Sequence, residues 1–264
     1  MRPGLIGALA LLLLVAPAAA PAAPPATYPS AADVSASTPA LAAQDAACIA
    51  GYYRGRLTRT AWRTPYYKLT RSEKLVTDRG FEHCMTLRER TTLIERQDTR
   101  SLGRHTNELR CSARRMARRS TPHLLAITSL AQAVADNDAV YRGCHLIGVL
   151  YSSLAASTEL RLTPAETECA NRTGSADPLR NRGKTLTIGQ RTAIGRVLDA
   201  CVGRTSETAM WTRLLKSFRP SGAIPCIAKR SVAITFVTFF SDRAGLQRAA
   251  KRAATHCVLP GSGT

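Results

Sequence analysis

The chain has 264 residues, and its 37 Lys and Arg against 18 Asp and Glu give a formal net charge of +19. This length allows one sizeable hydrophobic core or a small array of similar units. A membrane-spanning segment after the first residues is excluded, because the longest later apolar stretch, Val232 to Phe240, contains two Thr residues and is too short. The charge instead indicates anionic partners.

Residues 1–22 have the pattern of a secretory signal peptide. A single Arg2 precedes an apolar run from Leu5 to Val15, and possible Ala-x-Ala cleavage sites follow around Ala16 to Ala22. The run is about eleven residues long, whereas a membrane span needs roughly 20. We therefore predict an exported protein, secreted or associated with the cell envelope. An uncleaved N-terminal anchor is the alternative.

Residues 23–40 consist mostly of Pro, Ala, Ser and Thr. A segment of this composition buries too little apolar surface to form a core, so it is predicted to be a flexible tether. The folded domain is accordingly predicted over residues 41–264.

The eight Cys residues all lie in the predicted folded domain. They are Cys48, Cys84, Cys111, Cys144, Cys169, Cys201, Cys226 and Cys257. An even number of Cys residues in an exported chain indicates disulfides. Their intervals alternate between long and short, at 36, 27, 33, 25, 32, 25 and 31 residues. This alternation divides the domain into four repeats, each opened and closed by a Cys. The repeats cover about 41–100, 101–160, 161–218 and 219–264.

The segment before each closing Cys is predicted to be a helix with a polar N-cap. Residues 69–84 read LTRSEKLVTDRGFEHC, and residues 186–201 read LTIGQRTAIGRVLDAC. Ser, Thr and Asp side chains accept hydrogen bonds from the free N–H groups of a first helical turn. The candidate caps are Thr70, Ser129, Thr187 and either Ser241 or Asp242.

Apolar residues in these segments follow a helical period. Ile194, Val197, Leu198 and Cys201 are spaced i, i+3, i+4 and i+7, which places the Cys on a buried stripe that faces a neighbouring helix. We therefore predict a mainly α fold of four disulfide-closed helical hairpin repeats, forming a short array or a compact bundle. The alternative is accidental Cys spacing in an ordinary helical domain.

Two disulfide patterns fit these repeats. We favour Cys48–Cys84, Cys111–Cys144, Cys169–Cys201 and Cys226–Cys257, because this pattern closes every repeat in the same way. The rival pattern joins each closing Cys to the next opening one, and would leave the first Cys to pair with the last.

No motif in the sequence assigns catalysis, a metal site or a cofactor. Gly183-Lys184-Thr185 is similar to the end of a phosphate-binding loop, but Pro178 stands where such a loop needs Gly. His83, His145 and His256 adjoin closing Cys residues without the spacing of zinc ligands. We predict no catalytic residue, no metal and no cofactor; an active site dispersed along the chain remains an alternative.

One basic stretch, RCSARRMARRS at residues 110–120, is predicted to bind anions. It places Arg110, Arg114 and Arg118 at i, i+4 and i+8, with Arg115 and Arg119 beside them. On a helix these residues form a continuous basic face, whose like charges repel until an anionic partner neutralises them. The alternative is a solvated helix face.

A second stretch, GYYRGRLTRTAWRTPYYK at residues 51–68, mixes aromatic and basic residues without any acid. The candidate binding residues are Tyr52, Tyr53, Arg54, Arg56, Arg59, Trp62, Arg63, Tyr66, Tyr67 and Lys68. Aromatic faces beside cations bind sugars or bases by stacking, while the charges hold phosphates or uronates. The alternative is that the rings pack into the core of the first repeat, beneath Arg side chains that reach water.

These features predict an exported, non-enzymatic, basic protein that binds an anionic polymer or an anionic membrane surface, without a specific nucleic-acid target. Of the 37 basic residues 31 are Arg, whose planar fork suits phosphate and carboxylate. A secreted enzyme and a secreted protein-binding or inhibitor module are the alternatives. An acid and a His clustered in a deep pocket would favour the enzyme, and a flat apolar patch would favour the protein-binding module.

Overall fold

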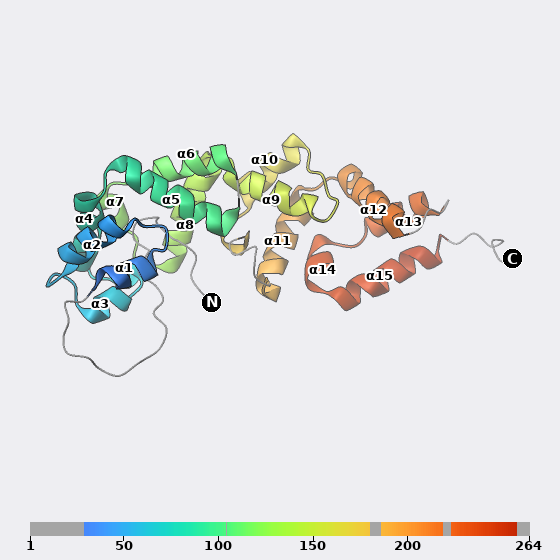
Figure 1. The fold of residues 1–264 in the computed structure, drawn as a ribbon. Helices are drawn as coiled ribbons and strands as arrows, with labels where there is room; N and C mark the ends of the chain where they lie inside the picture. The colour runs from blue at the N-terminus through green and yellow to red at the C-terminus, as the bar shows by residue number, and fades with distance from the viewer. Residues whose placement is uncertain (1–28, 104, 180–185, 219–222, 258–264) are drawn as a thin grey trace. The chain divides into compact units, whose positions relative to one another are not determined.

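The structure is a computed structural model that describes residues 29–103, 105–179, 186–218 and 223–257 (Figure 1). Within these ranges the chain forms fifteen α-helices and two short 3₁₀ helices, and no strand. The prediction of a mainly α, disulfide-stabilised fold is confirmed. The predicted signal peptide and the Gly183-Lys184-Thr185 motif lie outside the described residues.

The chain divides into two compact units between Cys144 and His145. The helices of the first unit are α1 (Ala31–Ser37), α2 (Ala43–Tyr53), α3 (Arg59–Arg63), α4 (Arg71–Cys84), α5 (Leu87–Leu102), α6 (Thr106–Ala117), α7 (Thr121–Leu125) and α8 (Leu130–Gly143), with a 3₁₀ helix at Tyr66–Lys68. Those of the second are α9 (Leu146–Ala156), α10 (Pro164–Thr173), α11 (Ile188–Cys201), α12 (Arg204–Phe218), α13 (Ile224–Ser231), α14 (Phe236–Ser241) and α15 (Arg243–Thr255), with a 3₁₀ helix at Asp177–Leu179.

All four favoured disulfides are present, and the rival pattern is wrong. They join Cys48 to Cys84, Cys111 to Cys144, Cys169 to Cys201 and Cys226 to Cys257. Each bond links α2, α6, α10 or α13 to the last residue of the helix that closes the same repeat, or to a residue one or two positions after it, with Cα atoms 5.5–5.8 Å apart. No Cys remains free, which is consistent with an oxidising, extracellular location.

The predicted N-caps are also confirmed. Thr70, Ser129 and Thr187 each accept a hydrogen bond from the third residue of their helix, whose own side chain accepts from the cap backbone in return. In the fourth repeat the cap is Asp242, which accepts from the N–H of Gly245. The four capped helices have nearly equal lengths of 14, 14, 14 and 13 residues.

The structure differs from the predicted tether at residues 31–40. Helix α1 lies inside this segment, begins at a capping box formed by Ser30 and Asp33, and packs against α2. Val34 and Thr38 are fully buried. One well-placed cap and one buried Val are enough to order a short helix against a stable neighbour, even where the surrounding composition is poor in apolar residues.

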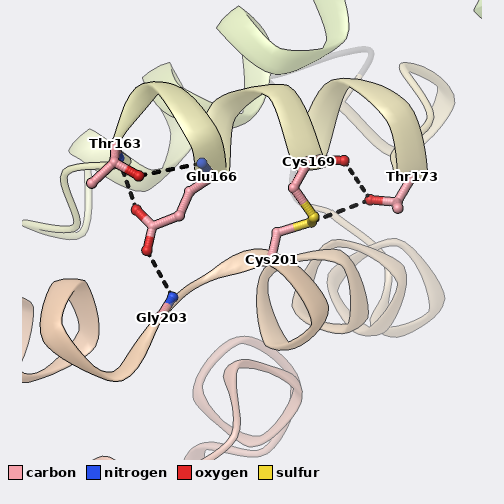
Figure 2. Close-up of a disulfide and its surroundings, with 6 residues drawn as sticks. All are labelled: Thr163, Glu166, Cys169, Thr173, Cys201 and Gly203. Atoms are coloured by element: carbon pink, nitrogen blue, oxygen red, sulfur yellow. Dashed lines mark hydrogen bonds between the residues drawn. A yellow bond between two sulfur atoms is a disulfide. The ribbon is translucent and has the colours of Figure 1, made fainter.

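In the second unit, α11 packs against α14, and α10 packs against both α9 and α11. The carboxylate of Asp199 on α11 accepts hydrogen bonds from the backbone N–H groups of Phe236 and Val237, which open α14. Figure 2 shows the Cys169–Cys201 disulfide between α10 and α11, with Glu166 one helical turn before it. None of the helices in the described ranges is both long and apolar enough to cross a membrane.

Candidate anion-binding surfaces

Helix α6 has one buried face and one basic face, as its sequence predicted. Leu109, Ala113, Met116 and Ala117 are buried, and the helix packs against α5 and α8. The remaining surface carries Arg110, Arg114, Arg115 and Arg118, all of which are exposed. We call these four residues the α6 basic face.

Few acids neutralise the α6 basic face. The Nε atom of Arg110 lies 3.8 Å from a carboxylate oxygen of Glu95, and the Arg110 side chain is 49% exposed, so this ion pair is weak. The guanidinium of Arg115 leans over Gly143 at the end of α8. Among the described residues, Arg114, Arg115 and Arg118 form no ion pair with a carboxylate. Their charge is therefore largely available to a ligand.

Arg119 does not belong to this face, which corrects its predicted binding role. Its side chain is only 6% exposed, and its Nη2 atom lies 2.8 Å from the carboxylate of Asp136 on α8. It also donates to the side-chain oxygen of Asn137 and to the backbone oxygen of Asp136. Its guanidinium is thus used to fix the chain after α6 against α8.

Three of the five aromatic residues in the 52–68 stretch lie in the core of the first unit. Tyr53, Trp62 and Tyr66 are at most 5% exposed and belong to one hydrophobic cluster. The hydroxyl of Tyr53 donates to the backbone oxygen of Thr77, and that of Tyr66 donates to Asp78. The faces of these three rings are covered. They therefore belong to the core of the first unit, which was the alternative interpretation, and not to the candidate binding surface.

The other two rings are also partly engaged. Tyr52 is half-buried, and the guanidinium of Arg56 stacks 4.4 Å from its centroid. The His83 ring lies 5.3 Å away from the same ring. Tyr67 packs against the hydrophobic core. What this stretch offers to solvent is therefore charge rather than a stacking platform, through the exposed residues Arg54, Arg56, Arg59, Arg63 and Lys68.

The second unit contains a basic region that the sequence reasoning missed. After Glu207 the chain has one acid, Asp242, against nine Lys and Arg residues. The exposed ones include Lys216 on α12, Lys229 and Arg230 on α13, and Arg248, Lys251 and Arg252 on α15. They are spread over three helices, so no short stretch reveals them. The scarcity of acids over the last 57 residues was the signal that could have found them.

The features that would favour an enzyme or a protein-binding module are weak in the described residues. A cavity of about 380 Å³ lies beside the N-termini of α2 and α5; its lining includes Asp45, Glu89 and Arg96, but no His. Burial, with a smaller contribution from Glu89, raises the pKa of Asp45. In the part of the chain that the structure describes, the large apolar residues that are exposed, Leu87, Leu130 and Ile188, lie on three different helices.

Buried titratable groups in the first unit serve the core. Lys74 and Asp78 on α4 are 3% and 4% exposed. Lys74 donates a 2.6 Å hydrogen bond to the backbone oxygen of Ile127, while Asp78 accepts from the Tyr66 hydroxyl at 2.9 Å. Burial raises the pKa of Asp78 to about 7. Both side chains are almost completely buried and bonded inside the unit, which is sufficient to explain the raised pKa of Asp78.

Within the described ranges, no three His, Cys, Asp or Glu side chains come together in a way that could hold a metal ion. No protein-family model, no curated protein and no solved structure matches the chain. The functional interpretation therefore depends on the surfaces themselves.

Proposed function

We propose that this protein is exported and binds linear anionic polymers through exposed basic surfaces, without catalysing a reaction. The observation that supports this most directly is the α6 basic face, where Arg110, Arg114, Arg115 and Arg118 project from a helix whose opposite face is buried. The N-terminal pattern and the four disulfides support export.

The α6 basic face has the chemistry of an electrostatic binding site. Guanidinium groups pair bidentately with phosphate or carboxylate oxygens. Like charges one helical turn apart repel each other, so a bound polyanion would relieve an existing destabilisation. The exposed cations of the 54–68 stretch lie in the same unit and add to its positive field.

A polymer fits this face better than a membrane. A helix that binds at a lipid surface inserts an apolar face between the headgroups. The apolar face of α6 is instead packed inside the unit, where Leu109, Ala113 and Met116 are at most 2% exposed. Contact with anionic lipids would therefore rely on charge alone, as it does for a polymer in solution.

The test measures binding of long-chain polyphosphate, of a polyuronate, and of vesicles with anionic lipids over a series of salt concentrations. The α6 variant replaces Arg110, Arg114, Arg115 and Arg118 by Gln. A matched control replaces four exposed Arg residues on α4 and α5, outside the α6 basic face. They are Arg71, Arg79, Arg88 and Arg100.

We expect polyphosphate affinity to fall steeply with salt, because bound counterions are released into a solution that already contains more of them. The α6 variant should bind more weakly and with a lower salt dependence than the control, at unchanged helical circular dichroism. Absence of binding at low salt would refute the proposal, and binding to vesicles alone would replace the polymer by a membrane surface.

A further inference from the structure

We propose that one face of α12 is a second binding site for a linear phosphate-rich polymer, located in the other compact unit from the α6 basic face. This inference rests on the proposed function and adds to it a site that no sequence motif assigned.

A shallow, largely open depression of about 640 Å³ lies on this face. Its lining residues are Arg204, Thr205, Thr208, Ala209, Thr212, Arg213 and Lys216. They recur at intervals of three and four, so they form one stripe along successive turns of the helix. Three of the seven are cations and none is an acid. We call this stripe the α12 basic groove.

Arg213 is fixed in place before any ligand binds. Its Nε and Nη2 atoms donate hydrogen bonds of 2.9 and 2.7 Å to the backbone oxygen of Glu159. A guanidinium has further N–H donors beyond these two, and they are left for an anion. Because the side chain is already ordered, it loses less conformational entropy when it binds a phosphate group.

Helix stability does not explain the position of Arg204. It is the first residue of α12, where a positive charge opposes the helix dipole. The carboxylate of Glu166 already accepts hydrogen bonds from the Gly203 N–H and the Ser206 hydroxyl at this end, so what Arg204 offers to a ligand is the charge of its exposed guanidinium. Lys216, by contrast, lies in the last turn, where a cation stabilises the helix in any case.

Few acids lie near the groove. One is Glu166, whose carboxylate is bonded to Gly203 and Ser206 at the start of α12, and another is Glu207 on α12 itself. Glu207 is 8% exposed, and burial raises its pKa to about 7, so its carboxyl group is only partly ionised near neutral pH. Asp242, the one acid after it, caps α15 and lies 3.8 Å from Arg248. Helix α13, which packs against α12, adds the exposed cations Lys229 and Arg230.

The test uses the double variant Arg204→Gln, Lys216→Gln. Both side chains are exposed, so their replacement should leave the fold intact. Arg213 is kept, because its loss would remove the two donors that bind the Glu159 carbonyl. The control is Arg172→Gln, Arg196→Gln in the same unit. Both residues are exposed, and they lie on α10 and α11, outside the stripe on α12.

The measurement is the affinity for long-chain inorganic polyphosphate at several salt concentrations, with circular dichroism and thermal unfolding as checks of folding. In the α12 variant we expect weaker binding, and a slope of log affinity against log salt that is smaller by about two, one for each phosphate contact removed. The control should keep a slope close to that of the wild type.

The outcomes separate the two proposals. If the wild type binds and the α12 variant matches the control, the second site is overturned while the proposed function stands. If only the α12 variant loses affinity and the α6 variant does not, the groove is the binding site and the role of the α6 basic face is overturned. If the wild type does not bind polyphosphate at low salt, both proposals fail.

Discussion

The carboxylate of Glu166 on α10 accepts a 2.7 Å hydrogen bond from the backbone N–H of Gly203, the residue before α12 (Figure 2). The same carboxylate accepts from the hydroxyl of Ser206 at 2.9 Å and from the backbone N–H of Thr163 at 2.7 Å. One acid thus caps its own helix, α10, and also joins it to the start of α12, alongside the Cys169–Cys201 disulfide. Burial alone would raise the pKa of Glu166, but these hydrogen bonds outweigh it and hold the pKa below its ordinary value.

Replacing Glu166 by Gln should therefore destabilise the second unit. The amide keeps one acceptor oxygen but turns its NH₂ group towards atoms that are themselves donors, so we expect a loss of about 1–3 kcal/mol in unfolding free energy at neutral pH. Because the folded-state pKa is lowered, the stabilisation is present above the unfolded pKa and disappears as the pH falls through the folded value. The difference between variant and wild type should shrink on acidification, in urea denaturation with the disulfides intact.

The control for this experiment is Glu168→Gln, on the same helix, where the side chain is 45% exposed. It should change stability by less than about 0.5 kcal/mol. An equal loss of stability for Glu166→Gln at neutral and at acidic pH would contradict the assigned role of the ionised carboxylate.

The contribution of Asp78 to the unfolding free energy should depend on pH in the opposite direction. Burial raises its pKa from 3.8 to about 7, so the folded state binds a proton that the unfolded state has already released. Wild-type stability should fall as the pH rises through this interval. The variant Asp78→Asn lacks the buried charge, and its oxygen can still accept from Tyr66. The unfolding free energy of Asp78→Asn, relative to that of the wild type, should rise by about 2–4 kcal/mol as the pH increases from 3.8 to about 7. Exposed Asp177→Asn is the control, and parallel pH curves for Asp78→Asn and wild type would refute this account.

Export can be tested on the protein itself. The Ala-x-Ala pattern predicts that the secreted product begins between about Ala19 and Ala26, because a short apolar run followed by small residues is what signal peptidase recognises. N-terminal sequencing of secreted material gives the answer directly. Retention of Met1 would leave the anchor alternative in place.

The parts of the fold that follow local rules could be predicted from the sequence. Thr70, Thr187 and the Cys intervals revealed the capped helices and the pairing, since capping and loop closure depend on residues close together in the chain. Helix α1 could not be predicted, because its order comes from packing against α2.

The surfaces were harder to predict, because exposure depends on residues that are distant in sequence. Arg119 follows the end of α6, so its direction is set by Asp136 on another helix rather than by the helical period. Tyr53 and Trp62 have the same sequence context whether they bind a sugar or fill a core. The helical period alone places Arg204, Arg213 and Lys216 on one stripe of α12, but only the structure shows that this stripe is open.

Gly195 on α11 marks a close approach to the backbone of α14, and its replacement tests the packing of these two helices. A Cβ atom at this position would lie 2.6 Å from the backbone N and Cα of Val237, and neither atom can move without displacing α14. We expect Gly195→Ala to lower the unfolding free energy by about 1–3 kcal/mol. Gly51 on α2 is the matched control, because a Cβ there meets nothing within 4 Å. In that open helical position Ala should instead stabilise the protein, by up to about 1 kcal/mol. Thermal unfolding of both variants gives the comparison, and a gain in stability for Gly195→Ala would show that α11 and α14 do not pack this closely.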